Sequence, residues 1–176
     1  LSVEEQPTGE ISLGAGIGTT GGVVGGSLKE KNFMGSGVIL DTDFQISDEG
    51  VKGSITYAKP NFNYTDNTLF TSIKSTTKDN LSSSGYKITT AGFSLGTKFE
   101  QYENLFFSPE IDFTQEDLTT NSSASNSFKK QEGSYSDFYF NYSLFYDTRD
   151  NSFNPNRGNV FIFNQELPLI SSDNEI

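Results

Sequence analysis

Cysteine, histidine and tryptophan are absent from the 176 residues, and methionine occurs once. Without cysteine and histidine, the chain has no disulfide, no thiol nucleophile, no zinc site of the usual kind and no histidine proton relay. The side chains on which most classes of enzyme rely are therefore missing from this chain. We therefore expect a non-enzymatic protein with no catalytic residue, no metal and no cofactor.

Long apolar runs are missing as well. No stretch approaches the roughly 18 to 20 consecutive apolar residues that a membrane-spanning helix requires. A helical membrane protein is thereby excluded. A transmembrane barrel remains possible, because every second side chain of a barrel strand faces a polar lumen and the chain is then hydrophilic on average.

Basic residues are few: 12 Lys and Arg against 23 Asp and Glu give a net charge of -11. The longest basic cluster is Lys129-Lys130. Nucleic-acid binding relies on clustered basic residues that neutralise phosphates. The charge balance therefore argues against a nucleic acid as partner.

A period-two pattern of apolar and polar residues begins at Gly9, and 16 Phe and 8 Tyr supply much of its apolar part. This period indicates β-strands rather than helices. The clearest run has apolar residues at every second position: Phe138, Phe140, Tyr142, Leu144 and Tyr146. They are interleaved with Asp137, Asn141, Ser143 and Asp147. Charged and apolar residues share one strand on opposite faces.

Turn signals divide the chain into about nine strands of about eight to eighteen residues, which bracket the roughly 9 to 11 that cross a bilayer. The sequence predicts an all-β, antiparallel up-and-down meander. Single-chain bacterial barrels normally close with an even strand number, so nine strands suggest a truncated barrel. The segment Asn121–Glu132 is rich in Ser, Asn and Lys and is predicted to be a long, mobile loop. The turns are Thr19–Gly22, Asn32–Gly37, Ser47–Gly50, Pro60–Asn67, Asp79–Gly85, Glu100–Asn104, Asn121–Gly133 and Arg149–Gly158.

Three motifs carry a functional and a structural interpretation. Gly16–Gly21 matches G-x-G-x-x-G, but Gly22–Gly26 would make a poor helix for a pyrophosphate site, so a glycine-rich hairpin is favoured. Asp41 and Asp43 could share a cation, but a solvated strand face is favoured. The run 147–151 is dense in Asp and Asn, yet it lacks the EF-hand pattern and contains Arg149, so a salt-bridged turn is favoured.

Glycine is concentrated at one place: eight of the 17 glycines lie between Gly9 and Gly26. Each glycine inside a strand costs roughly 0.5–1 kcal/mol relative to alanine. The first strand is therefore predicted to be locally weak and easily unpaired. In a closed barrel this is a defect unless opening at this strand is the function.

Two separated motifs resemble the bacterial surface antigen family, which includes the outer-membrane protein assembly factors. The first combines Glu4–Gly9, Gly14-x-Gly16 and Lys31–Gly37. The second is the turn after the eighth strand, formed by Asp147, Arg149, Asp150, Asn151, Pro155 and Gly158. The resemblance covers essentially the whole chain.

The resemblance implies a periplasmic arm of polypeptide-transport-associated (POTRA) domains before a 16-stranded barrel in the bacterial outer membrane. Residues 1–8 would end that arm, and residues 9–176 would form the N-terminal half of the barrel. The seam strand would template unfolded outer-membrane protein clients through the backbone of Gly9, Glu10, Ile11, Ser12, Leu13, Gly14, Ala15 and Gly16. Lipid and assembly-complex lipoproteins are the further expected partners. Thr19–Gly22, Ser47–Gly50, Asp79–Gly85 and Asn121–Gly133 would face outside the cell.

Two features depart from the family. The Arg-Gly-aromatic motif of its inward-folded loop is missing, because Arg157-Gly158 is followed by Asn159. The closing strand with its terminal aromatic residue is also missing. A two-partner secretion transporter, a lipase-linked surface antigen, a passive porin-like barrel and a soluble β-sandwich adhesin remain the alternatives.

Overall fold

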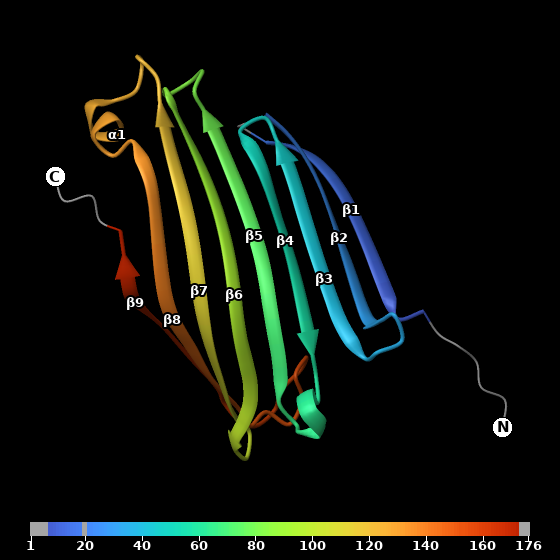
Figure 1. The fold of residues 1–176 in the computed structure, drawn as a ribbon. Coiled ribbons are helices and arrows are strands. Elements are labelled where there is room, and N and C mark those ends of the chain that lie inside the picture. Colours follow the sequence, from blue (N-terminus) through green and yellow to red (C-terminus); the bar gives the residue numbers. More distant parts are fainter. Residues whose placement is uncertain (1–6, 19–20, 173–176) are drawn as a thin grey trace.

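The computed structural model describes residues 7–18 and 21–172. Over these residues, nine antiparallel strands form one sheet in sequence order, with β1 and β9 at its two edges (Figure 1). The predicted all-β meander is confirmed.

The predicted end of a periplasmic domain falls mostly on residues 1–6, and these lie outside the described residues, as do residues 19–20 of the first turn. The strands are β1 (Gly9–Gly18), β2 (Gly21–Phe33), β3 (Val38–Ser47), β4 (Gly50–Lys59), β5 (Thr68–Asn80), β6 (Tyr86–Tyr102), β7 (Leu105–Thr120), β8 (Gly133–Asp147) and β9 (Val160–Ser171).

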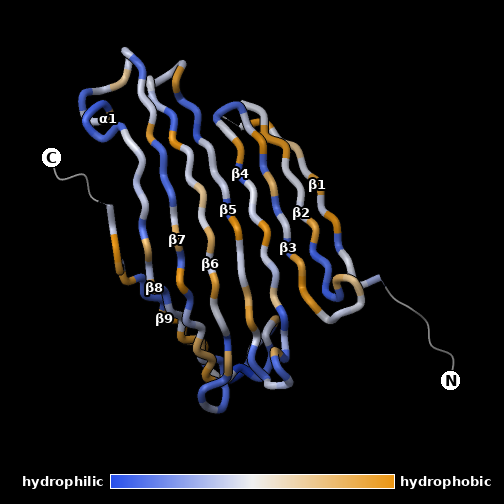
Figure 2. The backbone as a smooth tube through the Cα atoms, viewed as in Figure 1, coloured by the Kyte–Doolittle hydropathy of each residue, from blue (hydrophilic) through white to orange (hydrophobic). Residues whose placement is uncertain are grey.

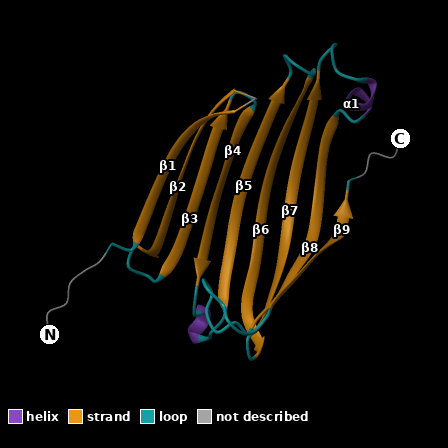
Figure 3. Ribbon diagram, turned by 180° about the vertical axis from the view of Figure 1, so that it is seen from behind, coloured by secondary structure: helices purple, strands orange, loops and turns teal. Residues whose placement is uncertain are grey.

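Two short helical segments lie at opposite ends of the sheet: η1 (Phe62–Tyr64) between β4 and β5, and α1 (Asn126–Lys130) between β7 and β8 (Figure 3). Within the described ranges, no helix is long and apolar enough to cross a membrane.

The connection that contains α1 is folded, which its low-complexity composition did not predict. The Ser125 hydroxyl caps α1 by accepting the N–H of Phe128. The Phe128 ring stacks on Tyr86 at 4.2 Å between centroids. Asn121 donates its N–H to the Gly85 oxygen, and Ala124 is buried. A cap and one aromatic anchor therefore dock this connection on the β5–β6 turn.

The strand register separates two faces, because residues paired across strands point to the same side of a sheet. Figure 2 shows the alternation of hydropathy along the strands. We call the two faces the apolar face and the polar face. One row of paired residues crosses all nine strands on the apolar face: Ile11, Leu28, Thr42, Ile55, Ile73, Phe93, Phe113, Phe138 and Ile170. The adjacent row lies on the polar face: Glu10, Lys29, Asp41, Thr56, Ser72, Ser94, Asp112, Tyr139 and Pro168.

The middle of the polar face holds an ion pair between strands that are not neighbours. Lys74 on β5 reaches across β6 to Asp112 on β7, with 2.8 Å between Nζ and Oδ2. Gly92 lies between them, and a Cβ there would come within 2.5 Å of the Lys74 Cε. The Asp112 side chain is only 7% exposed. A glycine in β6 thus lets a charge pair join β5 to β7.

The pairing of β6 with β7 is interrupted near Pro109. Paired residues run from Tyr86 to Gly96 and resume at Phe99, so that Thr97 and Lys98 are skipped. The residue that the register would place opposite Thr97 is Pro109, which has no N–H to donate. Proline in a central strand therefore leaves a local gap in the ladder.

Candidate functional site

The eight residues predicted to form the gate strand, Gly9 to Gly16, all lie in β1. This strand pairs with β2 and is an edge of the sheet. Every residue of β1 is exposed. The polar main-chain groups on its unpaired side are available to a further strand.

The register fixes which residues of β1 offer these groups. Lys31 donates its N–H to the Thr8 oxygen at 3.1 Å, and the pairing of β1 with β2 continues from there without a shift. Hydrogen-bonded pairs alternate along an antiparallel ladder. The main chains of Glu10, Ser12, Gly14 and Gly16 therefore face β2. The N–H and C=O groups of Gly9, Ile11, Leu13, Ala15 and Ile17 lie at the free edge.

Side chains contribute little to the attachment of β1. Over residues 7–18 and 21–172, no side chain of β1 makes a hydrogen bond or an ion pair. Gly14 is paired with Gly25, and a Cβ at Gly14 would meet nothing within 4 Å. Leu13 leans over Gly26, where a Cβ would come within 2.6 Å of the Leu13 Cδ2. The main-chain ladder and a few apolar contacts thus hold β1.

The opposite edge, β9, differs in its main chain. Thr148 donates its N–H to the Asn159 oxygen at 3.0 Å, and the register carries this phase along β9 as far as Pro168. By the same alternation, the free-edge position of Pro168 carries no donor. The register also shifts between Phe138 and Tyr139 of β8. The free edge of β9 is therefore less regular than that of β1.

The second predicted group of residues forms a tightly bonded turn. Arg149 donates to both carboxylate oxygens of Asp147, from Nε at 2.9 Å and from Nη2 at 2.7 Å. These bonds raise the pKa of Arg149. A salt-bridged turn was favoured over a calcium loop, and the structure has this salt bridge.

Asp150 closes the same turn on the other side. Its Oδ1 accepts the N–H groups of Asn156 and Arg157 at 2.9 and 3.2 Å, and these bonds hold the pKa of Asp150 below its usual value. Gly158 has φ +91°, and a Cβ there would overlap the Thr148 main chain. Pro155 lies in the same turn. Asp147, Arg149, Asp150 and Gly158 thus fix the shape of the turn.

The other two motifs have structural roles in the described residues. Gly16 and Gly18 lie in β1, and Gly21 opens a strand rather than a helix, so the hairpin interpretation is confirmed. Asp41 pairs with Lys29 at 3.1 Å, and Asp43 accepts a hydrogen bond from Ser54. Within those residues, no group of three or more acidic side chains is placed to hold a metal ion.

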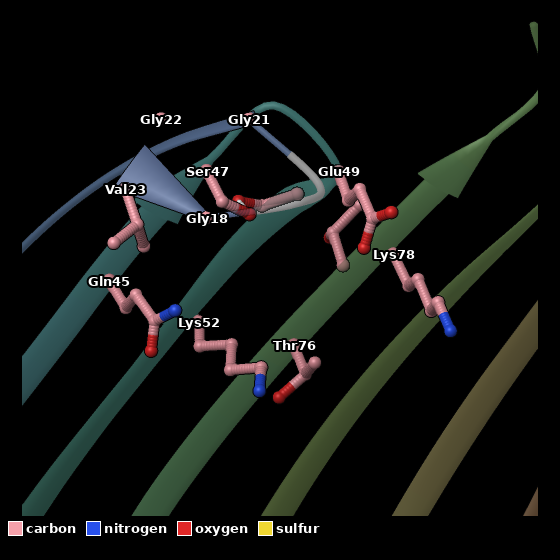
Figure 4. A pocket seen from close by; sticks show the side chains of 12 residues that line it. Gly18, Gly21, Gly22, Val23, Gln45, Ser47, Glu49, Lys52, Thr76 and Lys78 are labelled. Atoms are coloured by element: carbon pink, nitrogen blue, oxygen red, sulfur yellow. Dashed lines mark hydrogen bonds between the residues drawn. The ribbon is translucent and has the colours of Figure 1, made fainter. Parts of the chain in front are cut away.

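Sequence reasoning missed a hollow beside the tip of the first hairpin. It has a volume of about 500 Å³, and its lining includes Gly21, Gln45, Lys52, Thr76 and Lys78. In Figure 4 the side chains of Gln45, Lys52 and Thr76 project from neighbouring strands on the same side of the sheet. No sequence motif marks these residues, because the strand register alone brings them together.

Comparison with known proteins agrees with this fold. Residues 32–176 match the model of the Omp85 superfamily domain. A crystal structure of BamA from Haemophilus ducreyi lacking POTRA domains 1–3 superposes with a TM-score of 0.71 at 22% sequence identity. The match covers 94% of this chain and 35% of that chain, so the present chain spans about a third of its length. The nine-stranded meander corresponds to the N-terminal part of a BamA-like barrel. The protein is located in the bacterial outer membrane. The family match extends over most of the chain, which therefore belongs to the Omp85 superfamily.

Proposed function

We propose that this chain is the first part of the barrel of an outer-membrane protein assembly factor, in which β1 templates the strands of unfolded clients. The observation that carries the proposal is the free edge of β1, where Gly9, Ile11, Leu13, Ala15 and Ile17 present main-chain groups. In an up-and-down meander, a following strand would pair with β9. The outer side of β1 would then remain at the seam of the barrel. The working surface is main chain, and the function needs no catalytic residue and no cofactor.

The membrane supplies the driving force. An unsatisfied main-chain N–H or C=O costs several kcal/mol in lipid, and an added strand satisfies a whole row of them. Such β-augmentation depends on the main chain of the client more than on its side chains. A single edge can therefore serve many different clients.

The domain organisation follows from the same proposal. Residues 1–8 would connect β1 to a periplasmic POTRA-type domain, and residues 9–176 would form the first nine strands of a 16-stranded barrel. Unfolded outer-membrane proteins would be the clients. Lipoproteins of the assembly complex would be the accessory partners.

The phase of the β1 ladder gives a sharp test in the full-length protein. Proline at Ile11, Leu13 or Ala15 removes a donor from the free edge, whereas proline at Ser12, Gly14 or Gly16 removes a donor to β2. We expect the first set to reduce client insertion per folded molecule by about tenfold or more, because one carbonyl of the client stays unsatisfied in lipid. The second set should mainly lower the amount of folded barrel. Insertion is measured by the protease protection of a radiolabelled client.

Alanine at Ile11 and Leu13 is the matched control, because it shortens the side chain and keeps the donor. Equal loss of insertion per folded molecule in both proline sets would contradict the proposal. The described chain contains no cysteine, so a cysteine at Ser12 or Gly14 can be cross-linked to one in the last strand of a stalled client. Cross-linking only from 138–146 would rule out β1 as the gate strand. A proline variant that still inserts clients but no longer exports one dedicated partner protein would favour a two-partner secretion transporter.

A further inference from the structure

A single carboxylate joins the tip of the first hairpin to the next turn. Asp48, between β3 and β4, accepts the N–H of Gly22 on its Oδ2 at 3.1 Å. Gly21 has φ +108°, and a Cβ there would overlap the Asp48 carboxylate. Figure 4 shows Gly21 and Gly22 beside the turn that carries Ser47 and Glu49. Glycine at position 21 therefore allows both the strand entry and the approach of Asp48.

The turn that carries Asp48 is itself attached to the end of β5. The main-chain oxygen of Glu49 accepts the N–H of Asp79 at 2.6 Å. Further along the same end of the sheet, Asn121 donates from its N–H to Gly85 and from Nδ2 to the Leu81 oxygen, both at 2.8 Å. Hydrogen bonds that involve turn residues thus recur along this end of the sheet. Asp48 extends these contacts to the first hairpin.

The first hairpin has few other polar attachments. In the described part of the chain, β1 has no polar side-chain tie, and the ion pair between β2 and β3 is Lys29 with Asp41, near the opposite end of the hairpin. Among the described residues, the Asp48 contact is therefore the polar side-chain contact nearest to the tip of the hairpin. Loss of this contact would leave the tip held by the ladder between β2 and β3, which contains Gly25 and Gly26.

We propose that Asp48 is a positioning residue for the free edge of β1: it holds the hairpin tip against the β3–β4 turn and thereby fixes the orientation in which β1 meets a client strand. This inference rests on the proposed templating function. It adds a residue outside β1 that controls the edge through Gly22. The side chain of Asp48 does not contact the client itself.

The test compares three variants of the full-length protein in lipid nanodiscs by hydrogen–deuterium exchange. Asp48→Ala removes the acceptor, and Asp48→Asn keeps an acceptor oxygen of the same shape. Glu49→Ala is the matched control, because it removes the same charge from the same turn and leaves the main-chain oxygen for Asp79. We expect exchange at the hairpin tip to rise about five- to tenfold in Asp48→Ala, as for the loss of one hydrogen bond. Exchange in the other two variants, and in β7 of all variants, should match the wild type.

A second measurement follows the edge itself through the disulfide yield between a cysteine at Ser12 and a stalled client. The yield should fall severalfold in Asp48→Ala and return in Asp48→Asn, with equal amounts of folded barrel. Equal tip exchange in Asp48→Ala and Glu49→Ala would overturn the inference. Faster exchange with an unchanged cross-link yield would also overturn it, because Asp48 would then hold the tip without positioning the edge. The exchange measurement needs no client, so the absence of a cross-link in the wild type would count against the proposed function instead.

Discussion

The β1–β2 and β6–β7 hairpins share antiparallel pairing, but their strands are held differently. The first has ten paired positions and four glycines in each strand, whereas the second has 14 paired positions. The second also has an edge-on contact between Phe99 and Phe107, and Lys74 and Asp112 join the strands on either side of β6. Local stability differs within one sheet according to such contacts, and elements that move come from its weaker parts.

The largest expected effect is the loss of the ion pair in the stronger region. Lys74→Ala leaves the carboxylate of Asp112 poorly solvated, since its side chain is 7% exposed. We expect a destabilisation of about 2–3 kcal/mol, which is the order for an uncompensated charge of low exposure. The urea midpoint of the full-length protein in detergent micelles measures it.

Lys29→Ala is the control for this prediction, because Lys29 and Asp41 form a pair with side chains 50% and 41% exposed. Such a pair contributes about 0–1 kcal/mol. Equal shifts of the urea midpoint in the two variants would contradict the difference between the two regions.

The next largest effect is that of replacing a glycine by alanine, which should stabilise the first hairpin and destabilise the second. Gly14→Ala adds a methyl group where nothing lies within 4 Å, so β1 should gain about 0.5–1 kcal/mol through a lower entropy of the unfolded chain. Gly96→Ala in β6 places a methyl group within 2.8 Å of the Pro109 oxygen, and overpacking of this kind costs about 1–3 kcal/mol. Exchange of β1 and β6 amides measures both changes. A slower client insertion in Gly14→Ala would connect the weakness of β1 to function, and faster exchange of β1 would refute the prediction.

The smallest effect concerns the turn between β8 and β9. Because Asp150 has a lowered pKa in the folded turn, its contribution is present above the unfolded pKa and is lost as the pH falls through the folded pKa. We expect the amide shifts of Asn156 and Arg157 to titrate below the ordinary carboxyl value of about 3.9. Nuclear magnetic resonance of the isotope-labelled protein measures this, and Asp150→Asn should abolish the titration. A midpoint at or above the ordinary value would show that the turn does not hold Asp150.

The strands and turns were predictable because their signals are local. Alternation marked 138–146 as a strand, and glycine, asparagine and aspartate marked the turns between strands. The salt-bridged turn was predictable for the same reason, since Asp147 and Arg149 are two residues apart. The glycine content of β1 predicts a weak strand, and β1 lies at an edge of the sheet.

The remaining features depend on the register between strands, which no local pattern specifies. Lys74 and Asp112 are 38 residues apart, and Asp48 and Gly22 are 26 residues apart. The phase of the β1 edge also depends on one contact, from Lys31 to Thr8, that lies outside the strand. The docking of α1 was missed because Ser125 and Phe128 have meaning only beside Tyr86.

The two adjacent rows that cross the sheet, one apolar and one polar, limit how the gene for this chain can change in length. Deletion of one codon within a strand would transfer every later side chain of that strand to the opposite face, so that residues such as Phe93 and Ser94 would exchange places. Deletion of two codons would preserve the faces and shorten the strand. Viable deletions inside strands should therefore come in pairs of codons, while those of any size should collect in the turns.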